Sequence, residues 1–129
     1  MATITHINPD TMYRSPAFSQ AVSAEGARTI YVGGQNGIDA TGALVSDDFG
    51  AQSEQALHNV IAALGAAGAT QADVVKLTIY IVQGQDVHVG YAAAQKVWGP
   101  HPTAITGVIV AGLALPGALV EVDAIAVVD

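Results

Sequence analysis

The sequence predicts one α+β domain, in which a mixed β-sheet carries two amphipathic helices on one face. Apolar residues recur at helical spacing in two segments, residues 49–66 and 87–98, whereas six other segments are short and strand-like, most of them rich in β-branched residues. The expected order is β-β-β-α-β-α-β-β. A single domain spanning residues 1–129 is long enough to bury a core. One sheet covered by both helices is the economical way to bury two apolar helix faces.

The first part of the chain supplies three short strands. Residues 3–7 are β-prone and end at the turn-forming Asn8-Pro9-Asp10. Residues 18–24 and 29–32 follow, and the short link at Glu25-Gly26 predicts a hairpin between them. The second of these strands runs into Gly33-Gly34. Strand glycines indicate a bulge or a close approach of two backbones, and an open backbone lining a ligand pocket is the alternative.

Two helices and a long strand make up the middle of the chain. Acids in Ser46-Asp47-Asp48 favour a helix start, and the helix should run from about residue 49 to 66 and stop near Gly68. Its apolar stripe consists of Leu57, Val60, Ile61 and Leu64. In the strand at residues 73–82, one face should present Val75, Leu77, Ile79 and Ile81. The second helix opens after Gly84-Gln85-Asp86, and its core-facing stripe is Val87, Tyr91, Ala94 and Trp98.

The last two strands, residues 104–111 and 119–128, are joined by a loop of hairpin length and are expected to lie side by side. Glu121 and Asp123 are two residues apart in the second strand, so they share a face. An acid in such an apolar run is costly unless it is paired or faces a polar cavity. Glu121 could activate water or bind a cationic or amine-bearing ligand. The alternative is a solvated or inter-subunit polar patch.

Composition excludes several functional classes. Only four residues are Lys or Arg against eleven acids, and a net charge of -7 argues against nucleic-acid binding. The four histidines show no zinc spacing, there is no Cys, and no apolar run is long enough to span a membrane. No signal peptide is visible, so a cytoplasmic protein is expected. Because only 12% of the residues are charged, we expect another subunit to bury the open sheet face.

Several segments together resemble the RidA (YjgF/YER057c) family over nearly the whole chain. The segments are Ser15-Pro16-Ala17-Phe18-Ser19-Gln20-Ala21-Val22, Tyr31-Val32-Gly33-Gly34-Gln35, Gln55-Ala56-Leu57-His58-Asn59-Val60, Ala67-Gly68, Asp73-Val74-Val75-Lys76-Leu77-Thr78-Ile79-Tyr80, Pro102, Leu115-Pro116 and Val120-Glu121-Val122-Asp123-Ala124-Ile125-Ala126. The resemblance implies a chorismate-mutase-like fold and a homotrimer with three clefts between subunits. It also implies hydrolysis of 2-imino or enamine acids to 2-oxo acids and ammonia, without a cofactor.

The resemblance places a water-positioning glutamate at Glu121, and it shows departures elsewhere in the pocket. The family's carboxylate-binding arginine falls on Ala104, or on Thr106 when the chain is aligned backward from Glu121. The family's pocket serine or threonine falls on Gly33, its asparagine on Tyr91 and its tyrosine on Phe18. The candidate ligand-contacting residues are therefore Phe18, Gly33, Gly34, Tyr91, Ala104, Ile105 and Thr106.

These departures shape the functional hypotheses. A pocket with Glu121 and Asp123 but no arginine should suit neutral or amine-bearing ligands better than carboxylates. No basic residue lies near Ala104 in the sequence, and no metal is expected. The first hypothesis is a trimer that binds a small metabolite and hydrolyses an imine or enamine. The second is a non-catalytic metabolite sensor or protein-interaction trimer. A ribonuclease or translation inhibitor is disfavoured because the chain is so acidic.

Overall fold

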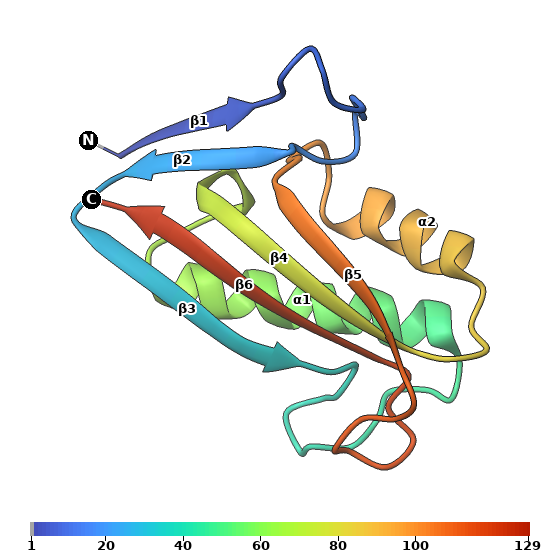
Figure 1. Cartoon of the computed structure of the whole chain (residues 1–129). Coiled ribbons are helices and arrows are strands. Elements are labelled where there is room, and N and C mark those ends of the chain that lie inside the picture. Colours follow the sequence, from blue (N-terminus) through green and yellow to red (C-terminus); the bar gives the residue numbers. More distant parts are fainter. Residues whose placement is uncertain (1) are drawn as a thin grey trace.

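The computed structural model describes residues 2–129 and has the predicted order of elements (Figure 1). Met1, included in the predicted domain, lies outside the described residues. The strands are β1 (Thr3–Ile7), β2 (Ala21–Glu25), β3 (Arg28–Gln35), β4 (Val74–Val82), β5 (Ala104–Val110) and β6 (Val120–Val128). The helices are α1 (Phe49–Ala66) and α2 (Val87–Val97), with a short 3-10 helix, η1 (Gln71–Asp73).

A mixed four-stranded sheet in the order β3-β6-β4-β5 forms the centre of the fold, as predicted for an α+β domain. β6 runs antiparallel to both β3 and β4, whereas β4 and β5 are parallel. The parallel pair is connected through α2, because parallel neighbours need a crossover. α1 lies against β3 and β6, and α2 lies beside α1 on the same side of the sheet (Figure 1).

The sheet has a core face and an open face, which β6 shows most clearly. Burial alternates along this strand, so the side chains on one face are buried under α1. Those residues are Val120, Val122, Ala124, Ala126 and Val128. On the other face the side chains are half-buried: Glu121, Asp123, Ile125 and Val127. We call this second side the open face.

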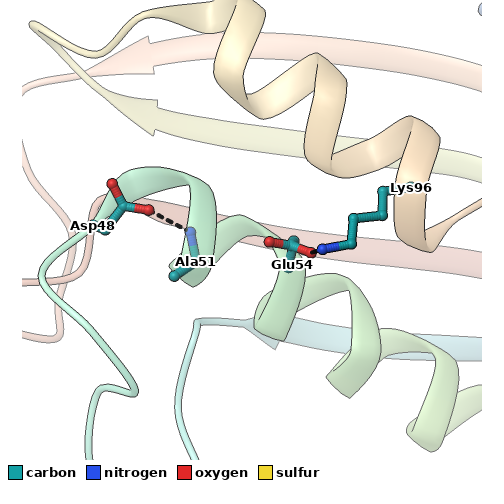
Figure 2. A network of polar contacts seen from close by, with 4 residues as sticks. All are labelled: Asp48, Ala51, Glu54 and Lys96. Atoms are coloured by element: carbon teal, nitrogen blue, oxygen red, sulfur yellow. Dashed lines mark hydrogen bonds and ion pairs between the residues drawn. The ribbon is translucent and has the colours of Figure 1, made fainter.

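Helix α1 begins and ends where the sequence predicts. The carboxylate of Asp48 caps it by accepting a hydrogen bond from the Ala51 amide at 2.9 Å (Figure 2). Three members of the predicted stripe, Leu57, Val60 and Leu64, are buried, and Ile61 packs against them. An ion pair of 2.8 Å between Lys96 of α2 and Glu54 links the two helices (Figure 2).

The predicted hairpin between residues 18–24 and 29–32 is wrong. β2 pairs instead with β1, as a separate two-stranded sheet, and β3 pairs with β6. The N-terminal sheet meets the edge of the main sheet through the bridge between Ser19 and Ala104. β3 joins β6 because its apolar residues Ile30 and Val32 then pack into the core under α1. That distant packing outweighs the short link between β2 and β3.

The expected adjacency of the last two strands is also wrong. β4 lies between β5 and β6, so the loop that joins them passes over an intervening strand rather than closing a hairpin. The crossover through α2 fixes β5 beside β4, and β6 then fills the central position between β3 and β4. The continuous alternation of buried residues in β6 suits that central position.

The predicted apolar faces of β4 and α2 are each wrong at one or two positions. A register shift between Val74 and Lys76 puts Val74 rather than Val75 into the core, ahead of Leu77. In α2, Trp98 is buried, but Val87 and Tyr91 remain 48% and 50% exposed because this helix packs chiefly against α1. Within residues 2–129, no helix combines the length and apolarity needed to cross a membrane.

Candidate functional site on the open sheet face

Glu121 lies on the open face between β3 and β4. Its register partner on β4 is Tyr80. On β3, the step from Val32 to Gln35 faces only the step from Ala124 to Val122 on β6, so Gly33-Gly34 forms a bulge with one extra residue. The predicted bulge is therefore present.

The bulge also makes room for the Glu121 carboxylate. A Cβ atom placed on Gly34 would overlap Glu121 Oε2 and would lie 2.7 Å from Glu121 Cδ. A Cβ atom on Gly33 would meet nothing within 4 Å. Glycine is thus required at residue 34 by close packing, and it is not required for that reason at residue 33.

A chain of side-chain amides connects α1 to Glu121. Gln55 Nε2 donates to Asn59 Oδ1 at 2.9 Å, and Asn59 Nδ2 donates to the carbonyls of Asn36 (3.0 Å) and Ile38 (2.9 Å). Asn36 Nδ2 in turn donates to Val120 O at 3.0 Å and approaches Glu121 Oε1 at 3.4 Å. This network fixes the loop after β3 and one side of the carboxylate.

Sequence reasoning did not find this amide network. Gln55 and Asn59 belong to a segment that carries the family resemblance, but the sequence assigns no role to them or to Asn36. Their polar character beside the apolar stripe of α1 was the available signal. Two amide side chains at i and i+4 beside a buried stripe can bond to each other and donate hydrogen bonds to the backbone of a neighbouring loop.

Asp123 and Tyr80 form a second polar group on this face. The negative charge of Asp123, followed by burial and by a side-chain hydrogen bond to Asp123, raises the pKa of the Tyr80 phenol. The charge of Glu121 acts in the same direction. Tyr80 is therefore held as a neutral phenol that donates a hydrogen bond to the Asp123 carboxylate.

A basic side chain, Lys76, also reaches the open face, although it is far from Ala104 and Glu121 in the sequence. Lys76 Nζ donates to Thr106 Oγ1 at 2.6 Å, from β4 to β5. Lys76 stands opposite Ala104 and Thr78 stands opposite Thr106 in the parallel register. No basic residue is close to Ala104 along the sequence, as expected, but the folded chain brings the Lys76 ammonium to this part of the sheet. Along β4, however, Lys76 is four residues from Tyr80, or roughly 13 Å.

The predicted site residues divide between the two faces of the sheet. Gly34 and Glu121 are in contact range on the open face, and the Lys76 contact places Thr106 there too. Strand alternation puts Ala104 on the same side, and Gly33 belongs to the adjoining bulge. Three others line a cavity on the helix side: Phe18, Tyr91 and Ile105. One chain therefore does not bring all eight residues together.

Comparisons with known proteins converge on one family. The family model described as Endoribonuclease L-PSP matches residues 10–128. The human 2-iminobutanoate/2-iminopropanoate deaminase is 35% identical over 112 residues, covering 85% of this chain and 79% of the relative.

Two solved structures extend the likeness to the fold. The Rid-family protein YyfB from Yersinia pestis, described as of unknown function, superposes with a TM-score of 0.86 at 38% identity, covering 96% of this chain and 98% of that one. The YjgF gene product from E. coli superposes with a TM-score of 0.71 at 31% identity, covering 85% of this chain and 87% of that one.

Proposed function

Because this chain belongs to the Endoribonuclease L-PSP family, which includes the RidA/YjgF proteins, we propose that it hydrolyses a small imine or enamine in clefts between the protomers of a homotrimer. The observation that carries the proposal is the Glu121 carboxylate, held against the Gly34 bulge and beside Asn36 on the open face. The proposed reaction uses no cofactor and takes place in the cytoplasm.

The open face supports the trimer. It carries Tyr31, which is 76% exposed, together with the half-buried Ile125 and Val127. An apolar sheet surface of this kind is normally covered by another layer or subunit. Phe18 and Tyr91 lie across the sheet from Glu121, so they can join one cleft with Glu121 only if they come from a neighbouring protomer.

Glu121 would serve as the general base. Its carboxylate takes a proton from water as the oxygen attacks the imine carbon, which gives a tetrahedral carbinolamine. That proton passes to the nitrogen, which completes the neutral carbinolamine. Glu121 then takes the proton of the carbinolamine hydroxyl and delivers it to the nitrogen as the carbon–nitrogen bond breaks, so a carbonyl compound and ammonia are released and the carboxylate is regenerated. Gly34 leaves room for the water-bearing carboxylate, and Thr106 lines the cleft.

The proposed substrate lacks a carboxylate. Glu121 and Asp123 outnumber the one ammonium group identified on this face, and Lys76 is directed toward Thr106 on the outer strand β5. A negatively charged substrate group beside Glu121 would therefore be repelled by both acids. A neutral or amine-bearing imine avoids that repulsion.

The proposal is tested with two imines that are generated in situ. Semicarbazide traps the imine that the protein has not hydrolysed, so less trapping means faster hydrolysis. A flavin-dependent amino-acid oxidase supplies 2-iminopropanoate, which bears a carboxylate, and a flavin-dependent amine oxidase supplies an imine without one. We expect the protein to suppress trapping of the second imine more strongly. Faster hydrolysis of 2-iminopropanoate, lost in Lys76→Met, would overturn the substrate assignment. Binding of both compounds without turnover would favour the non-catalytic trimer.

A further inference from the structure

The helix-side face of β4 is only partly covered. Under α1, the core-face residues of β6 are buried along the whole strand. β4 is also a central strand, yet only Leu77 is buried, whereas Ile79 and Ile81 on the same face are half-buried. Figure 1 shows α2 beside α1 at the β5 side of the sheet. A cavity of about 1020 Å³ remains between this helix and the strands β4 and β5.

Two features keep this cavity open. A Cβ atom on Gly90 would lie 3.0 Å from Phe49 Cζ, so α2 packs closely against the start of α1, and the ion pair between the helices secures its last turn. On β5, Gly107 stands opposite Ile79 in the parallel register, and a Cβ atom there would meet nothing within 4 Å. A large side chain at residue 107 would cover Ile79, so the open space depends on this glycine.

The cavity is continuous with the proposed cleft. Phe18, Tyr91 and Ile105, the predicted site residues on the helix side, all line it. Tyr91 is half exposed, whereas Leu77 and Val122 in the same lining are buried. The cavity therefore leads from residues of the cleft toward the core. A ligand with its reacting group in the cleft can extend its remaining part into this space.

The lining favours an apolar occupant. Within residues 2–129, no Asp, Glu, Lys or Arg lines the cavity, and its longer polar side chains, His88, Gln95 and His101, are exposed or half-buried. A charged group would enter without a counter-charge, which is unfavourable, whereas an apolar group gains free energy by covering Ile79 and Ile81. The volume is at the upper end of the range of about 300–1,000 Å³ for small-molecule sites, so it accommodates a group much larger than methyl.

We propose that the substrate carries a bulky apolar group which this cavity binds, and that Gly107 determines this specificity. The inference rests on the proposed function and names the class of imine or enamine that the cleft accepts. The imine carbon stays in the cleft, within reach of Glu121 of a neighbouring protomer, while the apolar group covers Ile79 and Ile81.

The experiment compares two imines with the same reacting centre. A flavin-dependent amine oxidase generates butan-1-imine from butylamine and 4-phenylbutan-1-imine from 4-phenylbutylamine, and hydrogen peroxide release is used to match the two rates of supply. The quantity compared is the protein concentration that halves semicarbazide trapping. We expect this concentration to be lower for 4-phenylbutan-1-imine by roughly tenfold or more, because the cavity removes the phenyl ring from water.

Gly107→Leu tests the cavity itself. The new side chain should occupy the space beside Ile79 and lower the preference for 4-phenylbutan-1-imine by roughly tenfold or more. Gly112→Leu is the matched control and should keep the wild-type preference, because this exposed loop glycine also has no neighbour within 4 Å of a Cβ atom and lies outside the lining. If Gly107→Leu does not fold, Ala94→Val narrows the cavity from α2. Equal suppression of both imines by the wild type, or an unchanged preference in folded Gly107→Leu, would overturn the inference.

A binding measurement separates this inference from the proposed function. 4-Phenylbutanamide has the same apolar chain and no imine, and calorimetry measures its affinity for the wild type, Gly107→Leu and Gly112→Leu. If neither imine is hydrolysed but the amide binds the wild type and Gly112→Leu and not Gly107→Leu, hydrolysis is refuted and the cavity remains assigned to an apolar group. If both imines are hydrolysed equally and the amide does not bind, hydrolysis stands and the present inference is refuted.

Discussion

Replacing Gly34 with alanine should abolish most of the hydrolytic activity while leaving the fold intact. The new Cβ atom would lie 2.7 Å from Glu121 Cδ, whereas ordinary contact begins near 3.4 Å, so the carboxyl carbon must move by about 0.7 Å or more. That shift also displaces the carboxylate relative to Asn36 Nδ2, which lies 3.4 Å from Glu121 Oε1. Misplacing a catalytic group by about 1 Å can cost roughly 10²-fold in rate.

The stability cost should be small, because the displaced atoms are the far end of a flexible side chain. Neither Gly33 nor Gly34 has a positive φ, so alanine fits the backbone at both positions. Gly33→Ala is therefore a matched control in the same bulge. We expect it to keep activity and to gain roughly 0.4–1 kcal/mol by restricting the unfolded chain.

The assay measures imine hydrolysis by semicarbazide trapping, together with urea unfolding and native mass spectrometry for both variants. The expected result is a large activity loss for Gly34→Ala only, with both proteins folded and in the same oligomeric state. If Gly34→Ala retains activity within twofold of Gly33→Ala, the close contact with Glu121 does not position a catalytic group, and the reasoning is refuted.

Three further predictions concern capping, buried amides and pH. Asp48→Ala should destabilise α1 by about 0.5–2 kcal/mol in urea unfolding, because it removes the bond to the Ala51 amide, whereas Asp47→Ala should have an effect within about 0.5 kcal/mol. Asn59→Ala should cost about 1–3 kcal/mol and lower turnover, since it releases the carbonyls of Asn36 and Ile38; a stable, fully active variant would contradict the positioning network. Asp123 raises the pKa of the Tyr80 phenol above its usual value of 10.0, so the stability that Tyr80 contributes is complete below that value and is lost as pH rises through the folded-state pKa. Asp123→Asn should therefore shift ionisation of this phenol toward lower pH, which is measured by ultraviolet absorbance with Tyr80→Phe as the reference. An unchanged titration would contradict this prediction.

Much of the fold was predictable because the decisive signals are local. The apolar spacing of α1 and the acids before residue 49 gave both ends of the helix, and the structure shows Asp48 as the cap. The β-branched runs located β4, β5 and β6. Strand order was not predictable in this way, because short loops suggested hairpins while the final pairing depends on which strand fills the centre under α1.

The candidate site was predictable only in part for the same reason. Alternation in β6 placed Glu121 and Asp123 on one face, and the paired glycines indicated the bulge that accommodates Glu121. Lys76 was overlooked because its approach to Thr106 depends on the parallel register of β4 with β5, which the sequence does not encode locally.

The most direct test of the account is the rate of imine hydrolysis by Glu121→Gln compared with Glu25→Gln. Glu25 is an exposed carboxylate at the end of β2, so its neutralisation changes the net charge equally without touching the open-face site. Removing a general base should slow hydrolysis by roughly 10²–10⁴-fold, and we predict that loss for Glu121→Gln alone. Equal rates for the two variants, both folded, would contradict the assignment of Glu121 as the group that activates water.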